Sequence, residues 1–368
     1  MATARKTKKS RGNKMKKCHQ FSISYRGWKI AVVYCCVLIF PSLLQSCTSQ
    51  NQELDSTSFI ISEKTAHDTD DPAIWYNEKD VSKSIVFGTD KNVKGAVYAF
   101  DLSGKIIEDK MIRDLAYPNN LDVEYAVSID ENTKVDILVI TERDKHQIRI
   151  FSIPDMKPLD NGGLKVFEDT ERESFKLPMG IGIYKSPKDG SVYIIVSRKN
   201  GPKNNYLYQY KLLSVAGKFE LYLIRKFGEF SEKKEIESIA VDDELGFIYY
   251  SDETFGIRKY FAEPTLGNKE VFSFGKNRFK GDSEGITIIP EANGTGYIIV
   301  SNQQNNSFSI FTRDTNEYIK EVDLGIKETD GCEFSNLVKN NMFTKGLFVA
   351  MNNEKNFYFF DFEIFGLE

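Results

Sequence analysis

Cysteine is nearly absent from most of this 368-residue chain, which excludes one common source of stability. Four of the five cysteines, Cys18, Cys35, Cys36 and Cys47, fall within the first 47 residues. Cys332 alone remains beyond them, so no intrachain disulfide can form there. We interpret Cys332 as a buried structural residue, because free cysteine is among the most buried residue types. Stability must therefore come from burial of the core and from any ligand that binds the native state.

Acidic side chains are missing from the first 30 residues, which hold ten lysines and arginines. An apolar run follows at residues 30–44, too short and too early for a membrane span, and it leads into Leu44-Gln-Ser-Cys47. This arrangement predicts a signal peptide over residues 1–47. Its end resembles a bacterial lipobox, in which the cysteine, here Cys47, is lipidated and becomes the mature N-terminus. The alternative is a simple secretory signal or a single-span anchor.

Residues 48–57 are polar and predict a flexible tether. Together with the lipobox they predict an exported protein, lipid-anchored to the bacterial cell envelope, that meets a membrane only through its N-terminal lipid. The formal net charge is −4 in spite of the basic leader, so the remainder of the chain is distinctly acidic. That balance argues against nucleic acid as a partner. We expect a monomer.

Short apolar or alternating segments recur in pairs over residues 58–368. In one pair, Val192-Tyr-Ile-Ile-Val196 is followed by Tyr206-Leu-Tyr-Gln-Tyr-Lys-Leu212, which reads as two strands. Six such pairs occur at a spacing of about 50 residues, which is typical of the blades of a propeller. The sequence therefore predicts an all-β fold, a six-bladed β-propeller over residues 58–368. An array of two β-sandwich domains is the alternative.

Carboxylates crowd together at Asp68-Thr-Asp70-Asp71, directly ahead of a predicted strand. Further acidic clusters stand at related points of later repeats: Glu235–Glu237, Asp252-Glu253, Asp282–Glu284 and Glu328–Asp330. Equivalent points of successive blades meet around the central channel of a propeller. Any one cluster alone would be an ordinary solvated turn, but together they offer many oxygen ligands to a hard cation. The pattern predicts a site for several Ca²⁺ ions.

The chain resembles the β-propeller phytases, Ca²⁺-dependent phosphatases that act on myo-inositol hexakisphosphate (phytate). The resemblance covers nearly all of the chain beyond the leader, and the order and spacing of its motifs agree throughout. These motifs are Asp70-Asp71-Pro-Ala-Ile-Trp75, Thr89-Asp-Lys91, Asn119-Asn-Leu-Asp-Val123, Lys134-Val-Asp-Ile137, Glu237-Ser-Ile-Ala-Val-Asp-Asp-Glu-Leu-Gly246, Asp282-Ser-Glu-Gly-Ile-Thr287 and Thr329-Asp-Gly331.

The resemblance implies seven calcium ligands and three phosphate contacts. The implied calcium ligands are Asp70, Asp71, Glu237, Glu253, Asp282, Glu284 and Asp330. Among them Glu237, Asp282 and Glu284 are implied to be catalytic. Lys91, Arg143 and Lys199 are implied to contact phosphate, which suits the planar fork of arginine and the compact charge of lysine.

The implied reaction is a calcium-dependent hydrolysis of phosphomonoesters by a metal-activated water. No Arg-His-Gly triplet is present, so a phosphohistidine route has no support, and no arginine stands six residues after Cys332 for a cysteine-based route. We interpret His67, beside the acidic run, as a turn residue. Two alternatives remain open at this point. One is a calcium-dependent propeller lactonase, and the other is a noncatalytic surface-binding propeller lipoprotein.

Three positions depart from the family pattern. Met179 stands where the family commonly has a tyrosine, Ser238 where it has a glycine, and Glu124 where it has an arginine. The missing hydroxyl and the reversed charge predict altered substrate affinity or an altered number of calcium ions.

Overall fold

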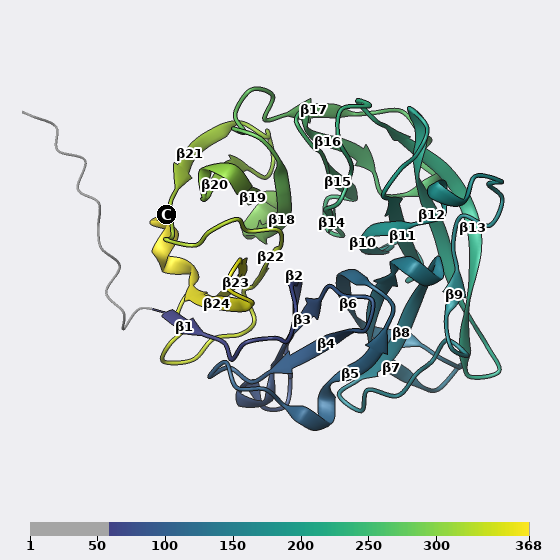
Figure 1. Ribbon diagram of the computed structural model, residues 1–368, viewed down its shortest axis with the longest axis horizontal. Coiled ribbons are helices and arrows are strands. Elements are labelled where there is room, and N and C mark those ends of the chain that lie inside the picture. Colours follow the sequence, from purple (N-terminus) through teal and green to yellow (C-terminus); the bar gives the residue numbers. More distant parts are fainter. Residues whose placement is uncertain (1–58, 368) are drawn as a thin grey trace, which may run out of the picture. The chain divides into compact units, whose positions relative to one another are not determined.

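The computed structural model describes residues 59–367, which form six four-stranded antiparallel sheets arranged in a ring (Figure 1). A cavity lined by all six blades marks the central channel. This confirms the predicted six-bladed β-propeller. The predicted signal peptide, Cys47 and the tether lie outside the described residues. Within residues 59–367 the helices are short 3-10 turns, and none of them has the length and apolar character needed to cross a membrane.

The first five blades follow the chain, each from its innermost strand to its outermost strand. Their strands are β2 (Thr69–Trp75), β3 (Ile85–Asp90), β4 (Gly95–Phe100) and β5 (Ile112–Leu115); β6 (Pro118–Ser128), β7 (Lys134–Glu142), β8 (Gln147–Ile153) and β9 (Leu164–Lys165); β10 (Pro178–Lys185), β11 (Val192–Arg198), β12 (Asn204–Val215) and β13 (Lys218–Glu229); β14 (Ile239–Asp242), β15 (Phe247–Asp252), β16 (Gly256–Phe261) and β17 (Phe272–Phe274); and β18 (Ser283–Pro290), β19 (Gly296–Asn302), β20 (Ser307–Thr312) and β21 (Tyr318–Val322).

The sixth blade joins the two ends of the described chain. Its inner strands are β22 (Cys332–Ser335), β23 (Leu347–Asn352) and β24 (Asn356–Asp361), and its outermost strand is β1 (Phe59–Ile61). Phe59 of β1 pairs with Phe360 of β24, and Ile61 pairs with Tyr358. The ring is therefore closed by hydrogen bonds between the first and last strands.

Residues 59–367 contain eight 3-10 helices, seven in connections between strands and the last one after β24. They are η1 (Val81–Lys83), η2 (Glu108–Lys110), η3 (Arg143–Lys145), η4 (Glu173–Phe175), η5 (Pro264–Leu266), η6 (Ala292–Gly294), η7 (Gln303–Asn305) and η8 (Phe362–Phe365). η3 and η7 directly follow the second strands of blades two and five, and each ends on a left-handed residue, His146 and Asn306.

The hydrophobic core lies between neighbouring blades, which explains why the second strand of each blade is apolar on both faces. Both faces of a second strand are covered by the adjacent blades, so these strands are continuous apolar runs rather than alternating ones. Ile137–Ile140 of β7 and Ile194–Val196 of β11 are completely buried. Packing of the second and third blades joins Val139 and Ile194 in one apolar cluster. These rigid walls fix the strand ends that carry the polar residues.

Candidate functional site

Each innermost strand carries, at or just before its start, a pair of consecutive residues at an equivalent position. The pairs are Asp70-Asp71, Asn119-Asn120, Met179-Gly180, Glu237-Ser238, Glu284-Gly285 and Asp330-Gly331. In β2, β6, β10 and β18 the pair lies where the register shifts against the second strand. Such an irregularity re-aims side chains, as a β-bulge does. The first members of five pairs line a cleft at the end of the channel, and the sixth, Asp70, contacts Lys91 of that cleft. Among the second members, Asp71, Asn120 and Ser238 line a separate cavity in the channel.

The second member of the pair is glycine in three blades because the neighbouring inner strand comes very close. A Cβ atom on Gly180 would lie 1.8 Å from the carbonyl oxygen of Glu237. On Gly285 it would lie 2.6 Å from the backbone nitrogen of Cys332. Real Cβ atoms do not approach backbone atoms this closely, so both contacts require the absence of a side chain. The glycines set the positions of the cleft residues beside them.

The ends of the second strands supply the other side of the cleft. The residues that directly follow β3, β7, β11, β15 and β19 are Lys91, Arg143, Lys199, Glu253 and Gln303. Four of these five residues line the cleft, which has a volume of about 210 Å³; Glu253 lies behind it in contact with Lys234. The propeller thus repeats one construction, with a strand start and a strand end from each blade meeting around the axis.

Carboxylates of the fourth and fifth blades form two groups that share Glu253. Oxygen atoms of Glu235, Glu237 and Glu253 lie within 4.8 Å of one another, and so do those of Glu253, Asp282 and Glu284. Oε1 of Glu253 and Oε2 of Glu284 are buried and accept no hydrogen bond. Buried carboxylate oxygens without donors are suited to a hard cation, which requires six to eight oxygen ligands. The donor set therefore fits Ca²⁺.

Three lysines partly neutralise these acids. Nζ of Lys91 lies 3.1 Å from Oδ1 of Asp70 and 3.3 Å from Oδ2 of Asp330. Nζ of Lys199 lies 2.7 Å from Oε2 of Glu235. Lys234 bridges the remaining group, with distances of 2.9 Å to Glu253 and 2.5 Å to Asp282.

Burial and mutual repulsion raise the pKa of the cleft carboxyl groups. Burial raises the pKa of Glu253 to about 8. Burial, and then the charge of Asp70, raise the pKa of Asp330 to about 7. For Glu284 burial and the charge of Glu237 raise the pKa well above its ordinary value. Carboxyl groups held in this state release protons when a cation binds, because the ionised form is then favoured.

Arg143 is held in place on the opposite side of the cleft. Its guanidinium carbon lies 3.5 Å from the centre of the Tyr117 ring, and one of its terminal nitrogens lies 3.7 Å from Sδ of Met179. Stacking on an aromatic ring leaves the N–H donors at the edge of the guanidinium plane free to bind an anion. Met179, one of the departures from the family pattern, thus packs against the arginine and offers no hydroxyl group to the cleft.

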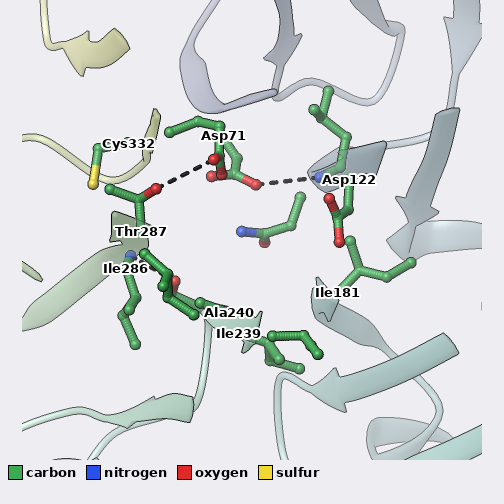
Figure 2. A pocket seen from close by; sticks show the side chains of 14 residues that line it. Asp71, Asp122, Ile181, Ile239, Ala240, Ile286, Thr287 and Cys332 are labelled. Carbon is green, nitrogen blue, oxygen red and sulfur yellow. Dashed lines mark hydrogen bonds between the residues drawn. The ribbon is translucent and has the colours of Figure 1, made fainter. Parts of the chain in front are cut away.

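Asp71 is separated from the other predicted ligands. Its carboxylate accepts a hydrogen bond from the backbone nitrogen of Leu121 at 3.3 Å and lines a channel cavity of about 140 Å³ (Figure 2). Asn120 lines the same cavity, and its Oδ1 is buried with no hydrogen-bond partner. Burial, followed by the charge of Asp70, raises the pKa of Asp71 well above its ordinary value. A cation at Asp71 would therefore occupy the channel rather than the cleft.

The far end of the channel provides a pH test of these buried acids. Burial, followed by the charge of Glu124, raises the pKa of Asp243 to about 8. Because the folded-state pKa is the higher one, Asp243 costs stability progressively as the pH rises from about 4 to about 8. Asp243→Asn removes the ionisation while Oδ1 can still accept the hydrogen bond from the Lys185 backbone. We expect the melting temperature of this variant to exceed that of the parent by roughly 2–4 °C at pH 9, with a smaller difference at pH 4.

Asp189→Asn is the control for this prediction. Hydrogen bonds from Ser191 lower the pKa of the exposed Asp189, so the amide should give no gain at high pH. Equal melting shifts for Asp243→Asn at pH 4 and pH 9 would contradict the proposed ionisation.

The structure brings most of the predicted site residues together. Glu237, Glu284, Asp330, Lys91, Arg143 and Lys199 line the cleft. Asp70, Glu253 and Asp282 reach it through their contacts with Lys91 and Lys234. The sequence did not point to four further residues of the site, Tyr117, Asn119, Lys234 and Gln303, and it indicated Glu235 only as a member of an acidic cluster. Asn119 lies within one of the family motifs, and Glu235 lies two residues before another. For Tyr117 and Gln303 the signal is their position beside a strand boundary.

The other two departures from the family pattern, Ser238 and Glu124, lie away from the cleft. Oγ of Ser238 accepts a hydrogen bond from the backbone nitrogen of Ile286, which ties the fourth inner strand to the fifth. Glu124 pairs with Lys185 at 3.4 Å toward the far end of the channel. Neither side chain lines the cleft, so their effect on a ligand there is indirect.

Fold and site together define a six-bladed propeller with an acidic cleft, bordered by lysine and arginine, whose carboxylate groups could hold metal ions. A sequence profile of the family described as Phytase matches residues 36–357. The 3-phytase of Bacillus subtilis (strain 168) is 30% identical over 300 residues, which cover 77% of this chain and 74% of that protein. The chain therefore belongs to the phytase family and is a phosphoric monoester hydrolase.

Similarity to solved structures supports the architecture alone. The WD40 β-propeller domain of Doa1 superposes with a TM-score of 0.51 at 10% sequence identity, covering 79% of this chain and 78% of that one. At this level of identity the match confirms the propeller fold and says nothing about substrate.

Proposed function

We propose that this protein is a calcium-dependent phytase that removes phosphate from myo-inositol hexakisphosphate. Two clusters of three carboxylates that share Glu253 carry the proposal. Within each cluster the ligand oxygens lie within 4.8 Å of one another, and lysine and arginine side chains line the same cleft. Family membership and the 3-phytase relative support the reaction class. The cleft is also lined by the basic residues Lys91, Arg143 and Lys199. They argue against a lactonase, which needs few basic side chains at this position.

The carboxylates of the fourth and fifth blades would hold calcium. When bound there, calcium supplies charge neutralisation for the substrate and activates water for attack on phosphorus. Glu237 belongs to this group, and burial, followed by the charge of Asp70, raises the pKa of its carboxyl group well above the ordinary value. Asp71, with the free Oδ1 of Asn120 nearby, would hold a separate ion in the channel.

The basic residues would orient the substrate. Arg143 presents its N–H donors from the face of Tyr117, and Lys91 and Lys199 place compact charges at the other edges of the cleft. A phosphate group held by these donors is fixed relative to the carboxylate side, where the reaction takes place. The cleft is small, so one phosphate group enters it while the inositol ring remains outside.

Phosphate release by the purified protein tests the proposal. We expect release from phytate with calcium present and its loss on addition of EGTA. Lys199→Ala and Arg143→Ala should each remove a charged phosphate contact worth about 1.5–3 kcal/mol and so lower kcat/KM by roughly tenfold or more, while calcium binding measured by calorimetry is kept. Lack of phosphate release from phytate and from simpler phosphomonoesters at any calcium concentration would refute the proposed activity.

We also propose that the mature protein is anchored to the bacterial envelope through lipid on Cys47. The lipobox-like end of the leader and the polar residues 48–57 support this arrangement. Each buried methylene of an acyl chain contributes roughly 0.8 kcal/mol to membrane binding. Cys47→Ser should therefore shift the protein from the membrane fraction to an unprocessed precursor or a soluble form. Cys332→Ser is the control and should leave fractionation unchanged. A parent protein found soluble, with a mature N-terminus other than Cys47, would exclude the anchor.

A further inference from the structure

Lys234 occupies the position that the acidic groups offer to a cation. It lies in the loop before β14, and its ammonium group contacts Glu253 at 2.9 Å and Asp282 at 2.5 Å. These two residues are members of the group whose oxygens, with those of Glu284, lie within 4.8 Å of one another. An ammonium held between two ligands of a metal position competes directly with the metal.

A second cavity adjoins the cleft on the other side of Lys234. It has a volume of about 300 Å³ and is lined by Arg172, Phe175, Lys199, Phe230 and Lys234 among others. Lys199 and Lys234 line both the cavity and the cleft, so the two spaces are adjacent. The guanidinium carbon of Arg172 lies 4.5 Å from the centre of the Phe175 ring, and Arg172 forms no ion pair with a carboxylate of residues 59–367. Arg172 therefore offers the cavity a positive charge available to an anion, whereas Lys199 and Lys234 are paired with carboxylates of the cleft.

The side chain of Lys234 is long enough to serve either space. Its exposed fraction is 44%, so it is anchored at its tip and not packed along its length. A divalent ion brings twice the charge of an ammonium to the same oxygens and displaces it. Because lysine has a flexible four-carbon stem, the released ammonium turns toward the adjoining cavity.

We propose that Lys234 is a resident counter-ion that exchanges with calcium and then becomes a phosphate-binding residue of the adjoining cavity. This inference rests on the proposed calcium-dependent function. Before calcium binds, Lys234 limits repulsion between Glu253 and Asp282. After calcium binds, it joins Arg172 and Lys199 in holding a second phosphate group of the substrate. Calcium and phosphate then bind with positive coupling through one side chain.

Two binding measurements on Lys234→Gln test the exchange. Without its competitor, calcium should bind the carboxylates more tightly, by about tenfold in calorimetric titration with CaCl₂. In the calcium-saturated variant, myo-inositol hexasulfate, an uncleaved analogue, should bind about tenfold more weakly than in the parent. A purely structural role for Lys234 would weaken both ligands instead, because a disordered cleft loses its calcium as well.

Neighbouring and conservative variants provide the controls. Lys233→Gln makes the same charge change one residue away, where Nζ donates to the backbone oxygen of Thr254, and should leave both affinities unchanged. Lys234→Arg keeps the competing charge, so it should fold like the parent and bind calcium no more tightly than the parent. If Lys234→Gln is unstable without calcium, its comparison with Lys234→Arg still tests the exchange.

Three outcomes overturn the inference. They are equal calcium affinity in Lys234→Gln and Lys233→Gln, unchanged hexasulfate affinity in calcium-saturated Lys234→Gln, or calcium binding by Lys234→Arg that is tighter than in the parent. A parent protein that binds no calcium at all would overturn both this inference and the proposed calcium dependence, whereas normal parental binding with any of the three outcomes overturns the exchange alone.

Discussion

Glu237→Gln and Asp282→Asn are expected to reduce phosphate release from phytate by about 10²-fold at limiting calcium, which corresponds to about 2.7 kcal/mol of transition-state stabilisation. Both changes preserve side-chain size and remove one negative charge from the group that would hold calcium. Asp282 also contacts Lys234 and accepts a hydrogen bond from Gln304 at 2.7 Å. Asp282→Asn therefore also removes one of the two carboxylate partners of the Lys234 ammonium group. Steady-state kinetics across a calcium titration, together with calorimetry, measures the effect.

The calcium titration separates these variants from changes at the basic rim. Higher calcium should partly restore the carboxylate variants, because lost affinity is compensated by mass action. It should not restore Arg143→Ala, which keeps every carboxylate. Glu328→Gln, an exposed acid whose side chain accepts only from Asn353 among residues 59–367, is the control. Parental activity of Glu237→Gln and Asp282→Asn at limiting calcium would contradict the assigned ligands.

Gly180→Ala is expected to be the most destabilising single methyl addition near the cleft, by about 3 kcal/mol or more. The new Cβ would lie 1.8 Å from the carbonyl oxygen of Glu237 and 3.0 Å from Oγ of Ser197. The backbone at Glu237 cannot move aside without separating the third and fourth inner strands. Thermal unfolding with calcium and with EGTA measures the loss, which should be accompanied by weaker calcium binding since Glu237 is displaced.

Gly190→Ala is the matched control because it isolates backbone strain from crowding. Gly190 has a φ of +72°, and a Cβ there would meet nothing within 4 Å. The left-handed conformation alone should cost about 1–2 kcal/mol. If Gly180→Ala destabilised the protein no more than Gly190→Ala, the close approach of the inner strands at Glu237 would not be as the structure shows.

The architecture could be predicted because its signals repeat along the chain. Six pairs of apolar segments at a constant spacing require repeated small sheets, and the acidic clusters fall at equivalent points of those sheets. The convergence of Glu237, Glu253 and Glu284 follows from that repetition. Closure of the ring by Phe59–Ile61 could not be predicted in the same way, since a three-residue strand carries almost no periodic signal.

The finer organisation of the site depends on features that a sequence pattern does not encode. Asp70 and Asp71 read as one acidic cluster, yet the irregularity at the start of β2 sends Asp70 to the cleft and Asp71 to the channel. Lys234 resembles its exposed neighbour Lys233, and only the position of the loop distinguishes a cleft cation from a surface charge. Strand irregularities and loop placement are set by tertiary packing, so their consequences appear only in three dimensions.

The pairing of β1 with β24 also determines when the propeller can be completed. The partners Phe59 and Phe360 are separated by nearly the whole described chain, so the ring stays open until the last blade has been synthesised. A polypeptide that emerges N-terminus first must keep β1 unpaired for that entire time. Five blades can form in order while the outer position of the sixth waits. Completion of the ring is therefore a late event, and a chain truncated before β24 would lack the contact that holds its first strand.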